Sequence, residues 1–398
     1  MDITIYPHKL EGCISAIPSK SQAHRLLICA AFSDASTTLY CPQTNRDIEA
    51  TVGCLNALGA EIIRTNDGYQ VRPVGKIPET AEINCYDSGS TLRFMLPIVC
   101  ALGIETTIHM SGRLPYRPLS PMWEELESHG AKLSRPTPTT IHTSGVLKPG
   151  EFKIDGNVSS QFITGLLFAL SLLKGQSKIS VIGNLESKPY VEMTQHVLAM
   201  FGVSSENYTV KGHMPFSTPG NVTVEGDWSN GAFFLTAQAL GNPLTVLNLD
   251  PHSTQGDRAI INILSSTEKV PSISAADIPD LIPILAVFYT VKGGAIFTNI
   301  ARLRLKESDR VASVINLLQN LGICVEADLH TMQVHGGQIQ GGIVDACSDH
   351  RIAMAAGIAA TVAKGPVTIL GAECVEKSYP TFWQEYQRLG GKYEQYIR

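Results

Sequence analysis

Cationic side chains recur beside small polar residues at the points where apolar stretches of helical length begin. Lys20 stands beside Ser21, and Arg25 follows Ser21 by four residues, which is about one helical turn. Residues 90–93 and 349–351 repeat this arrangement. Backbone N–H groups at a helix N-terminus have no intrahelical partner and favour anions. The pattern therefore predicts sites for phosphate and carboxylate groups.

The charge of the whole chain makes these local clusters more informative. The net charge is −5 and the sequence pI is about 6.1, so we expect no basic face for nucleic acid. Further cations stand near other polar loops, and arginine can pair with a carboxylate or phosphate through two hydrogen bonds. These cations are Arg117, Lys306, Arg310 and Lys377.

The polar loops recur at regular intervals along the chain. Their steps are 69, 71, 69, 51 and 69 residues, measured between positions 20, 89, 160, 229, 280 and 349. A second marker is a glycine that ends an amphipathic helix. This glycine steps by 71, 72, 120 and 68 residues, through Gly59, Gly130, Gly202, Gly322 and Gly390. Both series lose about twenty residues between positions 257 and 277.

This repeat predicts an α/β protein of six repeated units, of which the fourth is truncated. We expect two domains of three units each, because single cores rarely grow beyond about 250–300 residues. One domain would comprise residues 19–225, and the other residues 1–18 together with residues 226–398. The polar loops would then face each other across a cleft that holds the active site.

Composition excludes several classes of protein. The chain of 398 residues is 44% hydrophobic, but it contains no run of eighteen apolar residues, so we expect no membrane span. Residues 1–5 read as a strand and lack the features of a signal peptide. Nine cysteines are scattered without Cys-x-x-Cys or zinc-type spacing, which indicates reduced thiols and no metal site. We expect a cytoplasmic protein.

Six short motifs resemble the 5-enolpyruvylshikimate-3-phosphate synthase family of enolpyruvyl transferases. They follow the family's order over nearly the whole chain, and the resemblance implies two domains of three α/β units. The motifs are IPSKSQAHR at residues 17–25, DGNVSSQF at 155–162, QGD at 255–257, KESDR at 306–310, DHRIAM at 349–354 and KSYP at 377–380.

The resemblance implies two substrates, shikimate 3-phosphate and phosphoenolpyruvate, and a monomer without metal or organic cofactor. The residues it assigns to shikimate 3-phosphate are Lys20, Ser21, Arg25, Ser90, Ser159, Ser160, Gln161, Ser187, Tyr190, Asp280 and Lys306. Those it assigns to phosphoenolpyruvate are Lys20, Gly89, Arg117, Gln161, Arg310, Arg351 and Lys377. Glyphosate inhibits this family at the phosphoenolpyruvate site, and Gly89 leaves room for it.

The implied reaction is an addition followed by elimination of phosphate, which needs groups that accept and donate protons. Asp280 and Glu307 are the acid–base candidates, assisted by Lys20 and with His350 nearby. Their individual roles stay undivided. An alternative is that Asp280 only caps a helix beginning at Leu281, and that Glu307 forms an exposed pair with Arg310.

Two alternative functions stay open. The enolpyruvyl transferase that acts on UDP-N-acetylglucosamine shares the expected fold, but it carries Lys-Asn where this chain has Lys20-Ser21. It also has a cysteine in the loop that corresponds to residues 112–117, and this chain has none there. A non-catalytic binding protein would be expected to lose Lys20, Asp280, Glu307 or Lys377, and all four are present.

This sequence departs from the family pattern at Asp87, Phe94 and Arg302, and in its short fourth unit.

Overall fold

The computed structural model describes residues 1–212 and 215–396. The chain forms two compact units, which we call the continuous unit (Pro18–Glu225) and the discontinuous unit (Met1–Ile17 with Gly226–Arg398). Each unit has its own hydrophobic core. Pro18 lies in the continuous unit, whereas the sequence placed it in the other.

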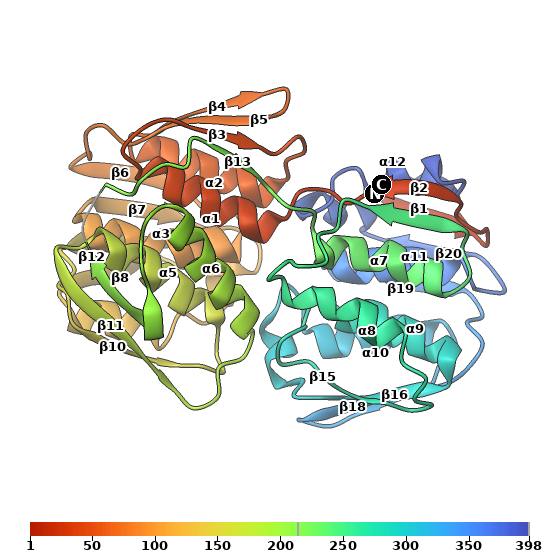
Figure 1. Ribbon diagram of the computed structural model, residues 1–398. Coiled ribbons are helices and arrows are strands. Elements are labelled where there is room, and N and C mark those ends of the chain that lie inside the picture. The colour runs from red at the N-terminus through yellow and green to blue at the C-terminus, as the bar shows by residue number, and fades with distance from the viewer. Residues whose placement is uncertain (213–214, 397–398) are drawn as a thin grey trace. The chain divides into compact units, whose positions relative to one another are not determined.

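Three sheets form in the described part of the continuous unit (Figure 1). The first has the order β13-β3-β5-β4, from Asn221–Thr223, Thr37–Tyr40, Gly68–Arg72 and Glu61–Thr65. The second has the order β6-β7-β9-β8, from Thr80–Asn84, Glu105–His109, Thr140–Gly145 and Ala131–Thr137. The third has the order β10-β11-β12, from Glu151–Asp155, Gly175–Ile182 and Thr209–Gly212.

Helices of two kinds accompany these sheets. The central helices are buried along most of their length, as expected for helices that are apolar almost all round; they are α1 (Lys20–Ala31), α3 (Gly89–Leu102) and α5 (Ser160–Leu172). The outer helices are amphipathic; they are α2 (Arg46–Ala57), α4 (Met122–Ser128) and α6 (Lys188–Met200). Two short 3-10 helices, η1 (Leu114–Tyr116) and η2 (Glu206–Tyr208), complete the described part of this unit.

The described part of the discontinuous unit repeats this plan. One sheet has the order β19-β20-β1-β21, from Gly342–Asp345, Val367–Leu370, Asp2–Tyr6 and Lys392–Tyr396. Another has the order β15-β16-β18-β17, from Ser272–Ser274, Gly294–Thr298, Thr331–His335 and Val325–Ala327. The third pairs β14 (Leu244–Leu247) with β2 (Gly12–Ser15).

Its helices divide in the same way. The central helices are α7 (Trp228–Ala239), α9 (Ile282–Lys292) and α11 (His350–Ala360). The other helices are α8 (Ile260–Leu264), α10 (Arg310–Asn320) and α12 (Phe382–Arg388). Three 3-10 helices lie between these elements: η3 (Gly256–Ala259), η4 (Ala301–Leu305) and η5 (Ala372–Lys377).

The expected repeat is visible in both units. In four repeats a central helix connects two parallel, paired strands, as α3 connects β6 to β7. The strands next to the two points where the chain passes from one unit to the other also pair in parallel. In the continuous unit β13 pairs with β3, and in the discontinuous unit β2 pairs with β14. The glycine that follows each amphipathic helix has a positive φ, which most side chains disfavour. This confirms the helix stops at Gly59, Gly130, Gly202, Gly322 and Gly390.

The fourth repeat is shorter than the others, as the two series of intervals predict. Helix α8 contains five residues, and the sheet of this repeat contains only β14 and β2 in the chain as described. One detail differs from the sequence analysis. Residues 229–231 lie inside the first turn of α7, because that helix begins at Trp228.

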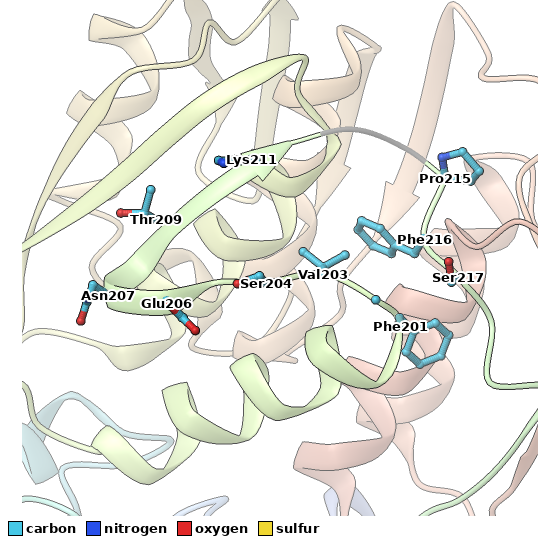
Figure 2. A pocket seen from close by; sticks show the side chains of 11 residues that line it. Phe201, Val203, Ser204, Glu206, Asn207, Thr209, Lys211, Pro215, Phe216 and Ser217 are labelled. Atoms are coloured by element: carbon cyan, nitrogen blue, oxygen red, sulfur yellow. The ribbon is translucent and has the colours of Figure 1, made fainter.

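A cavity of about 600 Å³ lies in the continuous unit, beside the end of α6 and β12 (Figure 2). Its described lining residues include Phe201, Lys211 and Phe216 and none of the expected site residues. Among the described residues, no helix combines the length and apolar character needed to cross a bilayer.

Candidate active site

The central helices of the continuous unit begin at residues that the sequence assigns to the site. The hydroxyls of Ser19, Ser88 and Ser159 each accept a backbone N–H from the first turn of the helix that follows. A capped N-terminus still presents further N–H groups, together with the positive end of the helix dipole. The first residues of these helices are Lys20, Gly89 and Ser160.

Lys20 is positioned by a buried carboxylate that the sequence analysis did not single out. Its Nζ lies 2.9 Å from Oδ2 of Asp47, and only 3% of the Asp47 side chain is exposed. Asp47 lies in the first turn of α2, which Asn45 caps. A charge-assisted hydrogen bond of this kind fixes the direction of a flexible lysine. The Lys20 ammonium is therefore held at the start of α1.

Arg25 is buried and bonded mainly to the protein. Nε donates to Thr194 Oγ1 at 2.8 Å, and Nη1 donates to the Ser21 carbonyl at 2.6 Å. Nη2 donates to the Tyr190 carbonyl at 2.9 Å and to Thr164 Oγ1 at 3.4 Å. These bonds occupy four of its five N–H groups. Burial lowers the pKa of Arg25 to about 10, so it stays charged at neutral pH.

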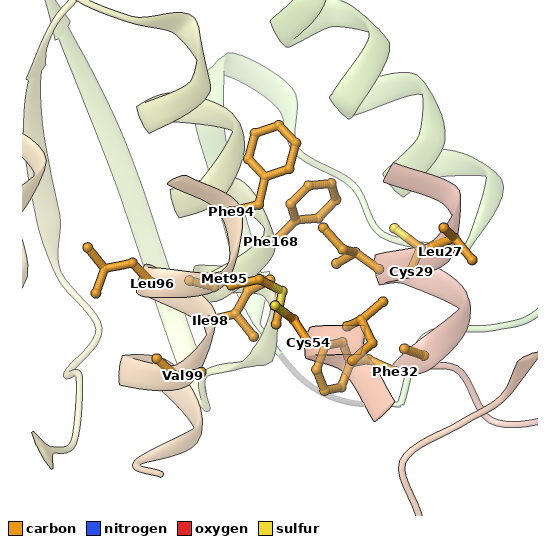
Figure 3. Packing of buried hydrophobic residues seen from close by; sticks show 14 of the residues in the cluster. Leu27, Cys29, Phe32, Cys54, Phe94, Met95, Leu96, Ile98, Val99 and Phe168 are labelled. Atoms are coloured by element: carbon orange, nitrogen blue, oxygen red, sulfur yellow. The ribbon is translucent and has the colours of Figure 1, made fainter. Parts of the chain in front are cut away.

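Phe94, one of the departures from the family pattern, lies directly beneath this arginine. The Arg25 guanidinium carbon is 5.4 Å from the Phe94 ring centroid, within the range of a cation–π interaction. Phe94 also meets Phe168 of α5 edge to face, with ring centroids 5.8 Å apart. Figure 3 shows both rings in the buried cluster with Met95. Phe94 thus belongs to the core that supports Arg25.

Gln161 connects the N-termini of α5 and α3. Its Nε2 donates to Ser90 Oγ at 2.9 Å, and its Oε1 accepts from Arg93 Nη1 at 2.9 Å. Nη2 of Arg93 donates to the Pro118 carbonyl at 3.2 Å, and the side chain is buried. These bonds bring together Gln161 and Ser90, and through helix α3 also Gly89, all of which the sequence analysis assigned to substrate binding. They also include Arg93, to which the sequence analysis assigned no substrate contact.

Gly89 lies against two arginines. A methyl group placed on its Cα would lie 2.6 Å from Nη1 of Arg117 and 2.8 Å from Nη1 of Arg93. The absence of a side chain therefore lets both guanidinium groups approach the start of α3. This geometry concentrates positive charge at a helix N-terminus, where an anion is favoured.

The remaining expected residues of this unit lie at the starts of α5 and α6. Ser159 and Ser160 stand at the start of α5. Ser187 precedes α6, is buried, and has a left-handed backbone with φ of 56°. Tyr190 lies in the first turn of α6, and its carbonyl accepts the bond from Arg25. Arg25 therefore joins α1 to the start of α6.

Arg310 is the centre of the second group of residues, in the discontinuous unit. Its side chain is 1% exposed. Nη1 donates to Asp280 Oδ1 at 2.7 Å, and Nη2 donates to Glu307 Oε2 at 2.9 Å. Asp349 accepts from Nε at 3.0 Å and from Nη2 at 3.3 Å, and the Pro279 carbonyl accepts from Nη1 at 3.3 Å. All five N–H groups of this guanidinium are engaged.

This geometry decides the two structural alternatives for the carboxylates. Helix α9 begins at Ile282 after Leu281 and has no side-chain cap, so Asp280 does not cap a helix. Glu307 and Arg310 do form an i,i+3 pair, but the arginine is buried. The pair is therefore part of a buried network and not a solvated surface contact.

Asp280 faces two further cations. Lys306 Nζ lies 3.9 Å from Oδ1, and Arg351 Nη2 lies 3.5 Å from Oδ2. Burial alone would raise the pKa of Asp280, but Lys306, Arg351 and Arg310 outweigh it and hold that pKa well below its ordinary value. Asp280 is therefore ionised and a weak base while these cations surround it.

The pKa values of the cations move in opposite directions. Burial, reinforced by Arg302 and Arg310, lowers the pKa of Lys306 to about 8. Burial also acts to lower the pKa of Arg310, but the carboxylates of Asp349, Asp280 and Glu307 outweigh it and raise that pKa. Lys306 is thus the cation of this group whose charge changes near neutral pH.

Arg351, His350 and Lys377 complete the expected set. Arg351 has longer contacts than Arg310: Nη1 lies 3.4 Å from Asn230 Oδ1, and the Asp280 contact is 3.5 Å. His350 begins α11 and is buried. Lys377 ends η5 and is 7% exposed. Because its contacts are longer, Arg351 is better able than Arg310 to turn toward a ligand.

Comparison with known proteins identifies the family. The family model described as EPSP synthase (3-phosphoshikimate 1-carboxyvinyltransferase) matches residues 5–386. A 3-phosphoshikimate 1-carboxyvinyltransferase of Clostridium kluyveri is 38% identical over 422 aligned residues, covering 99% of this chain and 98% of the relative. One of Clostridium novyi is 38% identical, covering 98% of each.

The chain belongs to the EPSP synthase family.

Solved structures agree on the fold. An EPSP synthase of Acinetobacter baumannii superimposes with a TM-score of 0.80 at 22% identity, covering 99% of this chain and 100% of that one. The family assignment does not favour the UDP-N-acetylglucosamine enzyme. The alignment of 422 positions also exceeds the 398 residues of this chain, which agrees with a shortened repeat.

Three residues that contact expected site residues in this EPSP synthase family member were not assigned from the sequence. Asp47 holds Lys20, Arg93 holds Gln161, and Asp349 holds Arg310. Asp349 also caps α11 and accepts from Ser308 Oγ at 3.0 Å. Asp349 is the first residue of the motif at 349–354, and Arg93 follows Ser90 by three residues, so their places in these patterns were the available signal. Asp47 lies 27 positions from Lys20, and only the packing of α1 and α2 brings them together.

Proposed function

We propose that this chain is a 3-phosphoshikimate 1-carboxyvinyltransferase. It transfers the enolpyruvyl group of phosphoenolpyruvate to the 5-hydroxyl of shikimate 3-phosphate, and it releases phosphate. The product, 5-enolpyruvylshikimate 3-phosphate, leads to chorismate and the aromatic amino acids. Besides family membership, the observation that carries this proposal is Arg310, a buried cation in contact with both Asp280 and Glu307.

In this proposal both groups of residues act on one pair of substrates. The phosphate of shikimate 3-phosphate binds at the N-terminus of α5, where Ser159 and Ser160 supply hydroxyls and backbone N–H groups. Its other contacts come from residues at the helix starts described above and from the pair Asp280 and Lys306. These other residues are Lys20, Ser21, Ser90, Gln161, Ser187 and Tyr190. Arg25 acts mainly by holding α6 and contributes at most its fifth N–H group.

Phosphoenolpyruvate carries a phosphate and a carboxylate, and it binds where cations concentrate. In the continuous unit these groups are Lys20, Gln161 and Arg117 beside Gly89. In the discontinuous unit they are Arg310, Arg351 and Lys377. Arg310 already uses every N–H group, so an anion that binds to it must displace one of its present acceptors, which are the carboxylates of Asp280, Glu307 and Asp349 and the Pro279 carbonyl.

This displacement changes how readily the carboxylates accept a proton. An anion at Arg310 and Arg351 offsets the charge that lowers the pKa of Asp280, so that pKa rises and the carboxylate becomes a better base. The 5-hydroxyl oxygen then bonds to C2 of phosphoenolpyruvate as the C2=C3 double bond opens, the hydroxyl proton passes to the protein, and C3 gains a proton. In the second step C3 loses a proton, the C2=C3 double bond re-forms, and the bond from C2 to the phosphate oxygen breaks.

Asp280, Glu307, Lys20 and His350 are the groups available for these proton transfers. The proposal leaves their roles undivided, because Asp280 and Glu307 both pair with Arg310 and neither is distinguished as acid or base. No cofactor takes part in these steps. We further propose a cytoplasmic monomer that binds neither nucleic acid nor a membrane.

The rival function is a binding protein that holds both substrates without reaction. Phosphate release from the two substrates tests the proposal directly. Asp280→Asn and Glu307→Gln keep the side-chain shape but remove a charge, so turnover should fall by about 100-fold or more with a smaller change in KM.

Glu61→Gln is the matched control, since Glu61 forms an exposed pair with Arg72, and such pairs contribute little. Binding of both substrates without phosphate release by the unmodified chain would establish the rival function.

A further inference from the structure

Three side chains with metal-binding atoms meet on one face of the hairpin formed by β17 and β18. Cys324 directly precedes β17, and Glu326 follows it by two residues, so both project to the same side of the strand. The register pairs Val325 with Val334, which places His335 opposite Cys324. Within this triad, each residue offers a ligand atom that lies within 4.8 Å of the other two.

One separation in this triad already matches metal coordination. His335 Nε2 lies 3.4 Å from Glu326 Oε1. Zinc binds nitrogen and oxygen at about 2.0–2.2 Å in tetrahedral sites, which places two such ligands roughly 3.4 Å apart. His335 Nε2 is shielded from solvent and makes no hydrogen bond within the described residues. The Cys324 side chain is exposed, and its sulfur lies within 4.8 Å of a ligand atom of each of the other two residues.

The surroundings leave room for a fourth ligand. His335 pairs on its other side with Gly294 of β16, which has no side chain. A hollow of about 790 Å³ lies beside His335 and is lined also by Gly293, Gly336 and Gly337. Cys324 and Glu326 are themselves exposed, so a water molecule can reach the triad and complete a tetrahedral site.

We propose that Cys324, Glu326 and His335 bind one Zn²⁺ ion together with water. A thiolate and an imidazole select zinc-like ions and disfavour Mg²⁺ and Ca²⁺, which prefer oxygen ligands. The thiol of Cys324 gives up its proton on binding, because the thiolate is the ligand. The ion ties β17 to β18 and stabilises the discontinuous unit, and it takes no part in enolpyruvyl transfer.

The alternative is an ordinary cross-strand pair of His335 and Glu326 beside an unrelated thiol. Glu326 is 72% exposed and His335 is 40% exposed, and such surface pairs contribute little to stability. The two readings differ in one measurable property. The zinc site requires all three side chains at once, whereas the pair does not involve Cys324.

Titration of the reduced, metal-free full chain with Co²⁺ tests the proposal, because Co²⁺ occupies zinc sites and absorbs visible light. We expect one equivalent of Co²⁺ to give a thiolate-to-cobalt band with the intense visible bands of a tetrahedral ion, and Zn²⁺ to displace it. Cys324→Ser should abolish the thiolate band. His335→Gln should weaken Zn²⁺ binding about tenfold or more, since even losing a partner of a metal ligand costs 10–100-fold.

Cys13→Ser is the matched control, because Cys13 is also exposed but lies outside the triad. It should leave the cobalt spectrum unchanged. Zn²⁺ should raise the melting temperature of the unmodified chain and of this control but not of Cys324→Ser, and phosphate release should be unchanged throughout. A missing thiolate band, a band that persists in Cys324→Ser, or the weak absorption of octahedral Co²⁺ would each overturn the proposal.

Discussion

At the scale of single residues, the proposed chemistry depends on how many of an arginine's hydrogen bonds the protein already uses. Arg310 is fully engaged by its surroundings, whereas Arg351 has longer contacts. Binding of an anion must therefore rearrange Arg310 more than Arg351. In the proposed mechanism this rearrangement is the step that releases the carboxylates to react.

The space beside Gly89 gives the first prediction. In Gly89→Ala the new methyl group would overlap Arg117 and Arg93, and the arginine side chains would have to move. We expect KM for phosphoenolpyruvate to rise several-fold and glyphosate inhibition to weaken by about tenfold, which corresponds to roughly 1.4 kcal/mol. Inhibition kinetics against phosphoenolpyruvate measure both effects.

Gly53→Ala is the control for this substitution. Gly53 lies in α2 with no atom within 4 Å of the added methyl group, so activity should be unchanged and the helix slightly stabilised. If the unmodified chain tolerates glyphosate as well as Gly89→Ala does, the assignment of this position is wrong.

Lys306 gives a prediction about pH. Because its pKa is lowered to about 8, Lys306 is charged below that pH and loses its charge as the pH rises through 8. The phosphate groups of the substrates are already ionised there, since their second pKa is about 6. We expect kcat/KM for shikimate 3-phosphate to fall above pH 8 and Lys306→Arg to shift this fall to higher pH. Identical alkaline limbs in both proteins would exclude Lys306 as the titrating group.

At the scale of elements, a buried chain of hydrogen bonds connects three helices, α1, α2 and α3. His24 Nδ1 contacts Thr51 Oγ1 at 2.8 Å, and Thr51 contacts Thr91 Oγ1 at 2.8 Å. Thr91 donates to Ser88, the cap of α3, at 2.8 Å. This chain fixes the start of α3, which carries Gly89, relative to α1 and α2.

Thr51→Val should break this chain without changing the volume of the core. It leaves His24 and Thr91 without one partner each, at a cost of about 1–3 kcal/mol. The melting temperature should fall by roughly 2–4 °C for each kcal/mol, and KM for phosphoenolpyruvate should rise as α3 shifts. Differential scanning calorimetry and steady-state kinetics provide the two measurements.

Thr290→Val is the control, because among the described residues the buried Thr290 hydroxyl donates only to the Ala286 carbonyl of its own helix, at 3.0 Å. Its melting temperature should fall less, and its KM should not change. Equal effects of the two substitutions would show that the hydrogen-bonded chain has no special role.

The shortened fourth repeat predicts a local loss of stability. Helix α8 is one short segment, and its Ile261 is 47% exposed, so few apolar contacts oppose its opening. Backbone hydrogen exchange should be faster across residues 257–277 than across residues 162–173, which cover most of the buried helix α5. Equal protection of the two segments would mean that the remaining contacts compensate for the missing residues.

At the scale of the whole molecule, the sequence predicts the repeated units better than it predicts contacts between residues that are far apart in the chain. Evenly spaced glycines and polar loops revealed the repeats and the short fourth one, because each repeat needs a helix stop and a helix start. Asp47 could not be assigned to Lys20 in this way, since their contact depends on how α1 and α2 pack. Cys324 and His335 escaped notice for the same reason, because strand pairing and not sequence spacing brings them together.

The central claim is that the whole chain breaks the C–O bond of phosphoenolpyruvate and transfers its three-carbon group. Phosphoenolpyruvate labelled with ¹⁸O at the bridging oxygen, incubated with shikimate 3-phosphate and the full chain, tests this claim by ³¹P NMR. The account predicts that the released phosphate carries the label and that shikimate 3-phosphate becomes an enol ether. Unlabelled phosphate with ¹⁸O retained in pyruvate, or no phosphate at all, would contradict it.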